Sequence, residues 1–176
     1  MALKSAALRG FRLELANVAD AGPTLPQPKI AIVTPPTRAP MHLNPYLVFS
    51  GQCEEALKFY AQVLGGKILA MMTHAGTPAE PHVPPEWRGK VMHARMTIGD
   101  KVIMASDSPP GRQDAMKGFA VSLGLDTPEE AERVFKAFSE GGTVGMAMAP
   151  TFFAARFGML VDRFGTPWMI ICEKAP

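Results

Sequence analysis

Residues 45–73, PYLVFSGQCEEALKFYAQVLGGKILAMMT, predict a strand, a helix and a second strand in immediate succession. The apolar run at 45–49 ends at Ser50-Gly51, as a short buried strand does. Over 53–64 the apolar side chains recur every three or four residues, which is the period of an amphipathic helix. Gly65-Gly66 is typical of a helix end, and residues 67–73 follow as the next strand.

This order of elements occurs twice along residues 41–176. In the first half, a loop rich in proline and glycine is followed by two further predicted strands, at 92–98 and 102–105. The second half contains a predicted strand, a helix and three more strands, at 118–125, 128–139, 144–149, 155–161 and 167–172. Both halves are therefore predicted to be βαβββ modules.

The second helix carries clear start and stop signals. Thr127 is a favoured N-cap residue, and Pro128 suits the first helical position. Gly141-Gly142 ends this helix at the place where Gly65-Gly66 ends the first one, which indicates an internal duplication. We predict one α+β domain over residues 41–176, with modules at about 41–108 and 117–176 that form an incomplete barrel around a central cavity.

Composition narrows the classes of partner. The chain has 176 residues, 47% of them hydrophobic, and a formal net charge of +2 without a basic stripe, so we expect no nucleic-acid partner. No apolar run approaches the roughly 20 residues that span a bilayer, so we expect no membrane partner. The two cysteines, Cys53 and Cys172, have no CxxC spacing, which fits a reducing, cytoplasmic location.

Residues 1–40 differ from the rest. A Leu/Ala/Arg-rich segment leads into AGPTLPQPKIAIVTPPTRAP, whose prolines disfavour helix and predict an extended or disordered linker. We interpret 1–40 as a disordered leader and Met41 as a candidate alternative start, because the strongly patterned sequence begins there.

Three stretches, taken together, resemble a known family: HLNPYLVFSGQCEEALKFYAQVLGG (42–66), MHARMTIGDKVIMASD (92–107) and FGMLVDRFGTPWMI (157–170). They are similar to the PhnB-like branch of the vicinal oxygen chelate superfamily, which includes glyoxalase I, extradiol dioxygenases and bleomycin-resistance proteins. The resemblance implies paired βαβββ modules, a ligand inside the concave sheet and a homodimer. Some relatives are described as methyltransferases, yet no glycine-rich strand-to-helix loop for an adenosyl cofactor is present here.

In the superfamily's metal enzymes, His, Gln or Glu side chains on the first and last strand of each module hold an octahedral divalent ion. Here these positions fall near Pro45, at Met104, at Phe119 or Ala120, and at Met169. None of these side chains is a ligand for a hard metal. We therefore expect no metal ligand and no cofactor.

His93 is the candidate catalytic residue, because it lies in a predicted strand on the face opposite Met92, Ala94 and Met96 and imidazole suits proton transfer near neutral pH. A strand histidine with a purely structural role is the commoner case. Asp107 could orient His93 or simply form a turn before Ser108.

The other candidate ligand-binding residues are mostly apolar. Methionines and aromatic side chains can line an adaptable apolar pocket or fill the core. The candidates are Tyr46, Asp107, Met104, Phe157, Trp168 and Met169. An anionic ligand such as a phosphonate would need convergent cations, for which Arg95, Arg156 and Arg163 are the candidates.

Three functions remain open on this basis. The first is a metal-independent protein that binds a small, largely apolar molecule, its activity otherwise unknown. The second is a lyase, isomerase or dioxygenase-like enzyme that uses His93, with or without a divalent metal. The third is a structural or regulatory dimer without a ligand.

Overall fold

The structure is a computed structural model that describes residues 41–109, 111 and 115–174. The predicted leader, residues 1–40, lies outside the described residues. In the part of the chain that is described, no helix is long and apolar enough to cross a bilayer.

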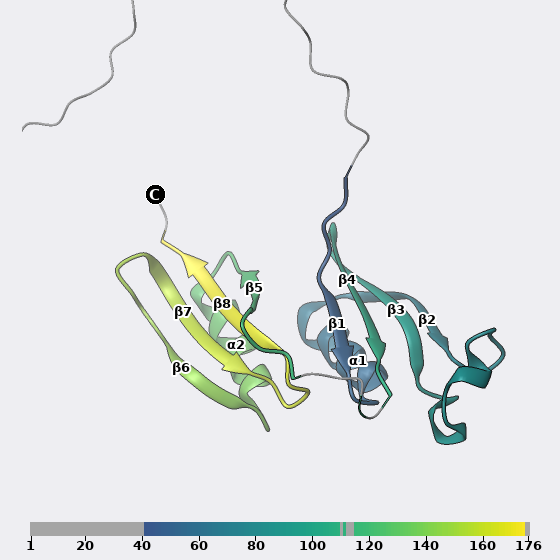
Figure 1. The fold of residues 1–176 in the computed structure, drawn as a ribbon. Helices are drawn as coiled ribbons and strands as arrows, with labels where there is room; N and C mark the ends of the chain where they lie inside the picture. Colours follow the sequence, from purple (N-terminus) through teal and green to yellow (C-terminus); the bar gives the residue numbers. More distant parts are fainter. Residues whose placement is uncertain (1–40, 110, 112–114, 175–176) are drawn as a thin grey trace, which may run out of the picture. The chain divides into compact units, whose positions relative to one another are not determined.

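The first module contains β1, α1, β2, β3 and β4 (Figure 1). Their bounds are Tyr46–Phe49, Cys53–Leu64, Lys67–Thr73, Val91–Ile98 and Lys101–Asp107, and two short 3-10 helices, η1 (Glu80–His82) and η2 (Pro85–Trp87), lie between β2 and β3. The sheet has the order β1-β4-β3-β2. Because β1 pairs with β4 in parallel, α1 is the crossover of this sheet.

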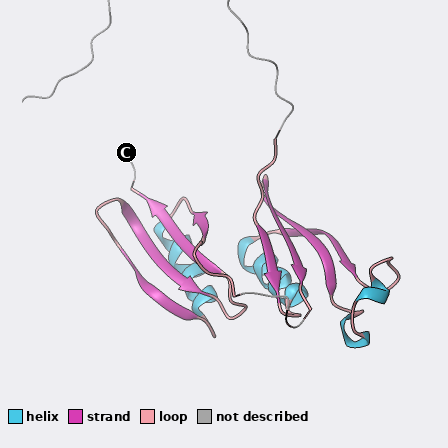
Figure 2. Cartoon of the chain, in the orientation of Figure 1, coloured by secondary structure: helices cyan, strands magenta, loops and turns pink. Residues whose placement is uncertain are grey.

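The second module repeats this plan with β5, α2, β6, β7 and β8 (Figure 2). Their bounds are Val121–Gly124, Pro128–Ser139, Thr143–Ala149, Ala154–Val161 and Pro167–Glu173. The sheet order is β5-β8-β7-β6, and β5 is parallel to β8. The predicted α+β fold of two βαβββ modules is confirmed, and the two sheets form no closed barrel in the described residues.

Both helices have the predicted bounds, but the two begin differently. Thr127 caps α2 locally, since its Oγ1 accepts the backbone N–H of Glu130 at 3.2 Å. At α1, Gln52 makes no side-chain cap hydrogen bond within the described residues. Instead Oδ1 of Asp107, at the end of β4, accepts the N–H of Cys53 at 2.9 Å. A residue 54 positions away in the chain therefore caps α1.

Strand bounds differ from the prediction by more than one residue at two places. The first strand of the second half begins at Val121 instead of residue 118, because Gly118 has a positive φ of 78°, which is outside the extended region. Strand β4 continues two residues beyond the predicted end, since Ser106 and Asp107 pair with Val48 and Phe49 of β1. The predicted loop between β2 and β3 also contains η1 and η2.

One hydrophobic core joins the two modules. It contains helix-facing side chains from both sheets together with both helices: Leu47, Phe49, Leu57, Tyr60, Met96, Ile103, Val134, Phe138, Leu160, Trp168 and Ile170. The ring of Tyr60, from α1, lies 5.3 Å from that of Trp168 in β8 and 5.7 Å from that of Phe138 in α2. Because alternate strand residues point to opposite faces, the other face of each sheet is turned away from this core.

Candidate functional site

The open face of the first sheet is defined here as the side that α1 does not cover, and we name it face A. Its members alternate along each strand with the buried residues and are exposed or half-buried. They are Tyr46, Val48, Lys67, Ala70, Met72, His93, Arg95, Thr97, Val102, Met104 and Ser106. Face A therefore contains the predicted residues Tyr46, His93 and Met104.

Tyr46 and His93 are in contact although they lie on different strands. The phenolic oxygen of Tyr46 is 3.2 Å from Nδ1 of His93, and the two rings stack with centroids 5.8 Å apart. Tyr46 can satisfy Nδ1 as donor or as acceptor, depending on the tautomer. In either case Nε2 of His93 is left for another partner. The prediction that His93 points away from Ala94 and Met96 is confirmed, since both of these are fully buried.

Asp107 faces the core and contacts backbone groups. It is 5% exposed, Oδ1 accepts the N–H of Cys53 and Oδ2 accepts the N–H of Val91, both at 2.9 Å. Burial, with further effects from Asp107 and Glu54, raises the pKa of the Cys53 thiol from 9.0 to about 12. Among the described residues His93 contacts Tyr46 and not Asp107. The sequence left open whether Asp107 orients His93 or forms a turn, and in the structure its carboxylate accepts two backbone N–H groups.

The open face of the second sheet, which we name face B, is mostly apolar, with Ser122 of β5 beside Met169. Met169 of β8 pairs with Met159 of β7, which pairs in turn with Met146 of β6. Phe157 pairs with Ile171 on the same face, and its ring lies 5.2 Å from that of Phe153. The predicted residues Phe157 and Met169 therefore lie together, on the sheet that does not carry His93.

Trp168 faces the core instead of a ligand surface. It is 1% exposed, and its indole Nε1 donates to Oδ2 of Asp162 at 2.9 Å. The hydroxyl of Tyr60 donates to the same oxygen at 2.6 Å, and Oδ1 accepts the N–H groups of Phe164 and Thr166. Burial is the largest cause that raises the pKa of Tyr60, followed by the charge of Asp162.

Sequence reasoning missed this Tyr60–Asp162 link. The signal that was present is Asp162 followed by Gly165 and Trp168, a turn that surrounds its own carboxylate with donors. Nothing local to Asp162 indicates that its fourth donor comes from a helix 102 residues earlier.

The three candidate arginines have different surroundings. Arg156 forms an ion pair with Glu132 of α2 at 2.5 Å. The guanidinium of Arg163 lies 4.2 Å from the ring centroid of Phe59 and 4.8 Å from that of Phe164, a cation–π geometry. Arg95 is exposed on face A and has no ion-pair or hydrogen-bond partner for its side chain among the described residues.

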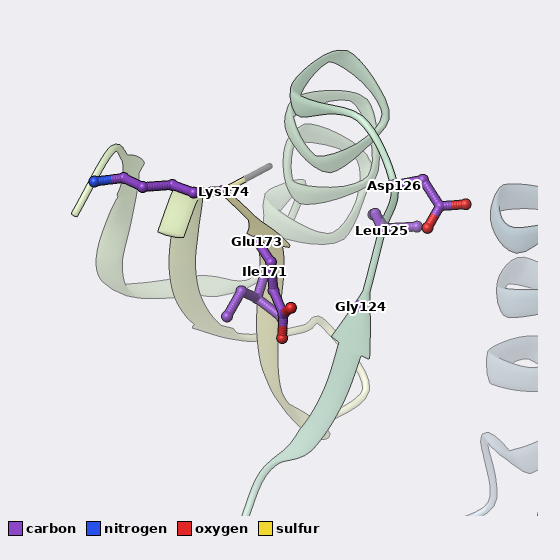
Figure 3. A pocket seen from close by; sticks show the side chains of 6 residues that line it. All are labelled: Gly124, Leu125, Asp126, Ile171, Glu173 and Lys174. Atoms are coloured by element: carbon purple, nitrogen blue, oxygen red, sulfur yellow. The ribbon is translucent and has the colours of Figure 1, made fainter. Parts of the chain in front are cut away.

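Two hollows of ligand size lie apart from these residues. One, of about 410 Å³, is at the ends of β5 and β8, where Asp126 and Glu173 form part of its wall (Figure 3). The other, of about 470 Å³, lies between Leu64 and Ile98 of the first module and Leu123 and Val134 of the second. Neither is lined by a predicted site residue.

The residues at the superfamily's metal positions do not fit a hard divalent ion. Met104 and Met169 offer soft thioethers, and they lie on faces A and B respectively. No cluster of three His, Cys, Asp or Glu side chains that could hold a metal occurs within the described ranges.

Comparison with known proteins bears on these observations. The model of the family described as 3-demethylubiquinone-9 3-methyltransferase matches residues 41–171. Protein YjdN of Escherichia coli K12 is 33% identical over 142 residues, which cover 76% of this chain and 97% of YjdN. The chain belongs to this family. This is the family that the predicted PhnB-like resemblance indicated.

Solved structures extend the PhnB-like assignment. Protein PA1353 of Pseudomonas aeruginosa is 44% identical, with a TM-score of 0.70 over 77% of this chain and all of PA1353. The Bacillus cereus protein is 23% identical, with a TM-score of 0.65 over 75% of this chain and 99% of its own. A glyoxylase/bleomycin resistance protein/dioxygenase domain from Frankia, 10% identical, has a TM-score of 0.55 over 78% of this chain and 100% of its own. The last two show a shared fold, and the predicted resemblance is confirmed.

Proposed function

We propose that this PhnB-like protein binds a small, largely apolar ligand on the open faces of its two sheets. The observation that carries the proposal is the composition of those faces. Apolar side chains that are not part of the core lie there half-exposed. Met72 and Met146 are 47% and 48% exposed, and Phe153 is 46% exposed. Such flexible thioethers and rings adapt to apolar ligands, and an exposed apolar patch commonly marks a binding surface.

A homodimer is the second part of the proposal. Faces A and B both point away from the shared core, so one chain does not enclose a ligand between them. Face A against face B of a second copy would cover both faces of both copies around one two-fold axis, whereas A against A or B against B covers only half. This arrangement would bring Tyr46, His93 and Met104 opposite the partner's Phe157 and Met169.

Light scattering after gel filtration tests the dimer. The expected mass is twice 19.0 kDa, and Met146→Glu should shift it toward the monomer because it puts a charge on apolar face B. Lys58→Glu, on an exposed position of α1, is the matched control and should leave the mass unchanged. A wild-type mass of 19.0 kDa at all concentrations contradicts the dimer.

Fluorescence of the neutral apolar probe N-phenyl-1-naphthylamine tests ligand binding. A saturable increase that is weakened by Met104→Glu and retained in Lys58→Glu supports the proposal. Unsaturable or absent binding to wild type contradicts it, whatever the oligomeric state.

The contact between Tyr46 and His93 supports a second candidate function, a lyase, isomerase or dioxygenase-like activity that uses His93. A half-buried imidazole whose Nδ1 is held at 3.2 Å by a phenol presents Nε2 in a fixed direction. A screen for turnover of candidate substrates by wild type and by His93→Gln tests this second function. If the function is correct, the variant keeps its fold and loses any activity that wild type shows.

We also infer a cytoplasmic location, which is supported by two buried, unpaired cysteines, Cys53 and Cys172. Recovery of the native protein from an oxidising compartment after cell fractionation contradicts this inference.

A further inference from the structure

The charges on face A are all of one sign. Among its described members, Lys67 and Arg95 are basic, and no position is occupied by Asp or Glu. The acids nearest in the sequence are used elsewhere, since Asp107 accepts two backbone N–H groups on the core side and Asp100 pairs with Lys101 in the turn. Face A is therefore a surface that favours negative charge in a small ligand.

Arg95 lies at the centre of this face. It is on β3 between buried Ala94 and Met96, and it pairs across the sheet with Ala70 on one side and Met104 on the other. Ala70 is too short to cover the guanidinium. Because Arg95 is exposed and its side chain has no acid partner among the described residues, its guanidinium can form a charge-assisted hydrogen bond to an anion.

His93 is two residues from Arg95 on the same strand and the same face, so their Cα atoms are about 7 Å apart. When the hydroxyl of Tyr46 donates to Nδ1, the imidazole proton is on Nε2, which can then donate to a ligand. Met72 pairs directly with His93, and Met104 pairs with Arg95. Two donors thus lie side by side, with a thioether next to each.

We propose that the ligand of face A is a small amphipathic anion. Its acid group is held by the guanidinium of Arg95 and by Nε2–H of His93, and its apolar part lies on Met72 and Met104. Tyr46 is a positioning residue that fixes the imidazole. This inference rests on the proposed binding function and adds the class of ligand to it.

Two fluorescent probes with similar apolar ring systems separate the proposed binding function from the proposed preference for an anion. The first, 8-anilinonaphthalene-1-sulfonate, is an anion, and the second, N-phenyl-1-naphthylamine, is neutral. Arg95→Gln should weaken binding of the anionic probe about tenfold, the effect of losing one charge-assisted hydrogen bond, and change binding of the neutral probe less than twofold. Arg95→Lys should recover part of the loss, since it keeps the charge but loses the planar geometry.

Lys58→Gln is the matched control, because it removes one positive charge from the exposed surface of α1. Equal affinity of Arg95→Gln and Lys58→Gln for the anionic probe, with the neutral probe still bound, overturns the anion inference and leaves the binding function intact. Failure of wild type to bind either probe overturns both. A circular dichroism spectrum identical to wild type verifies that Arg95→Gln is folded.

Discussion

The two modules have the same topology, yet each fastens its helix and uses its open face in a different way. Helix α2 is capped by its own neighbour, Thr127, whereas α1 is capped by Asp107 from the far end of its sheet. Face A carries Tyr46, His93 and the basic Lys67 and Arg95 beside its methionines, whereas the predicted site residues of face B are the apolar Phe157 and Met169. Two modules with the same strand order can therefore differ in the partners of their buried carboxylates and in the side chains on their open faces.

We expect the largest loss of stability when Asp162, the buried carboxylate of the second module, is removed. Asp162→Ala leaves four buried donors without their acceptor, including the hydroxyl of Tyr60 and the indole of Trp168. We expect a loss of about 3–5 kcal/mol in the free energy of unfolding, measured by urea denaturation. Asp100→Ala, in an exposed turn, is the control and should leave the midpoint unchanged.

We expect a smaller loss of stability when Asp107, the buried carboxylate of the first module, is removed. Asp107→Ala removes the acceptor of only two backbone N–H groups, those of Cys53 and Val91, so we expect a loss of about 2–3 kcal/mol in the same experiment. A loss greater than that of Asp162→Ala contradicts the ranking of the two modules.

The local cap of α2 should contribute about 1 kcal/mol. Thr127→Ala removes the acceptor for the N–H of Glu130. A loss of about 1 kcal/mol in the free energy of unfolding is typical when such a cap is removed. Gln52→Ala at the matching position of α1 should have almost no effect, because its side chain makes no cap hydrogen bond with the described residues. Equal effects of the two substitutions in urea denaturation argue against the different capping of the two helices.

The smallest effect is expected from pH just above 9. The thiol of Cys53 has a pKa of about 12 in the folded state against 9.0 when unperturbed, so folding favours its protonated form. Its contribution to stability is present below pH 9 and is lost as pH rises from 9 toward 12. At pH 9.5 the urea midpoint of wild type should fall slightly more than that of Cys53→Ala, each measured relative to pH 8. Identical shifts for the two proteins contradict the assignment.

How far the sequence predicted the molecule depends on whether the signal was local. The helices over 53–64 and 128–139 were predicted to the residue, because period, caps and glycines are all local. The start of β5 was not, since Gly118 has a positive φ that an extended strand does not adopt. Alternation placed His93 on the face opposite Ala94 and Met96, and the structure adds that those two residues are buried.

For the candidate site, the sequence supplied the residue types but not their grouping. Tyr46 and His93 meet because β1 and β3 both flank β4, a neighbourhood that only the strand order reveals. Phe157 and Met169 were assigned to the same cavity, and they lie together on the other sheet. Trp168 was assigned there too, but its neighbour Asp162 binds it from the core side. Whether a given face of a strand packs against the shared core depends on segments far away in the sequence, so no single segment predicts it.

The hydrogen bond between Tyr60 and Asp162 also has a consequence for how the chain folds. The two residues are 102 positions apart, so the bond closes only after nearly the whole domain has been synthesised and brought together. The core of the second half includes the ring of Tyr60 from the first half, so either half alone would lack part of this core. We therefore expect that neither half reaches the native fold when expressed alone, although the sequence pattern indicates that the two halves arose by duplication.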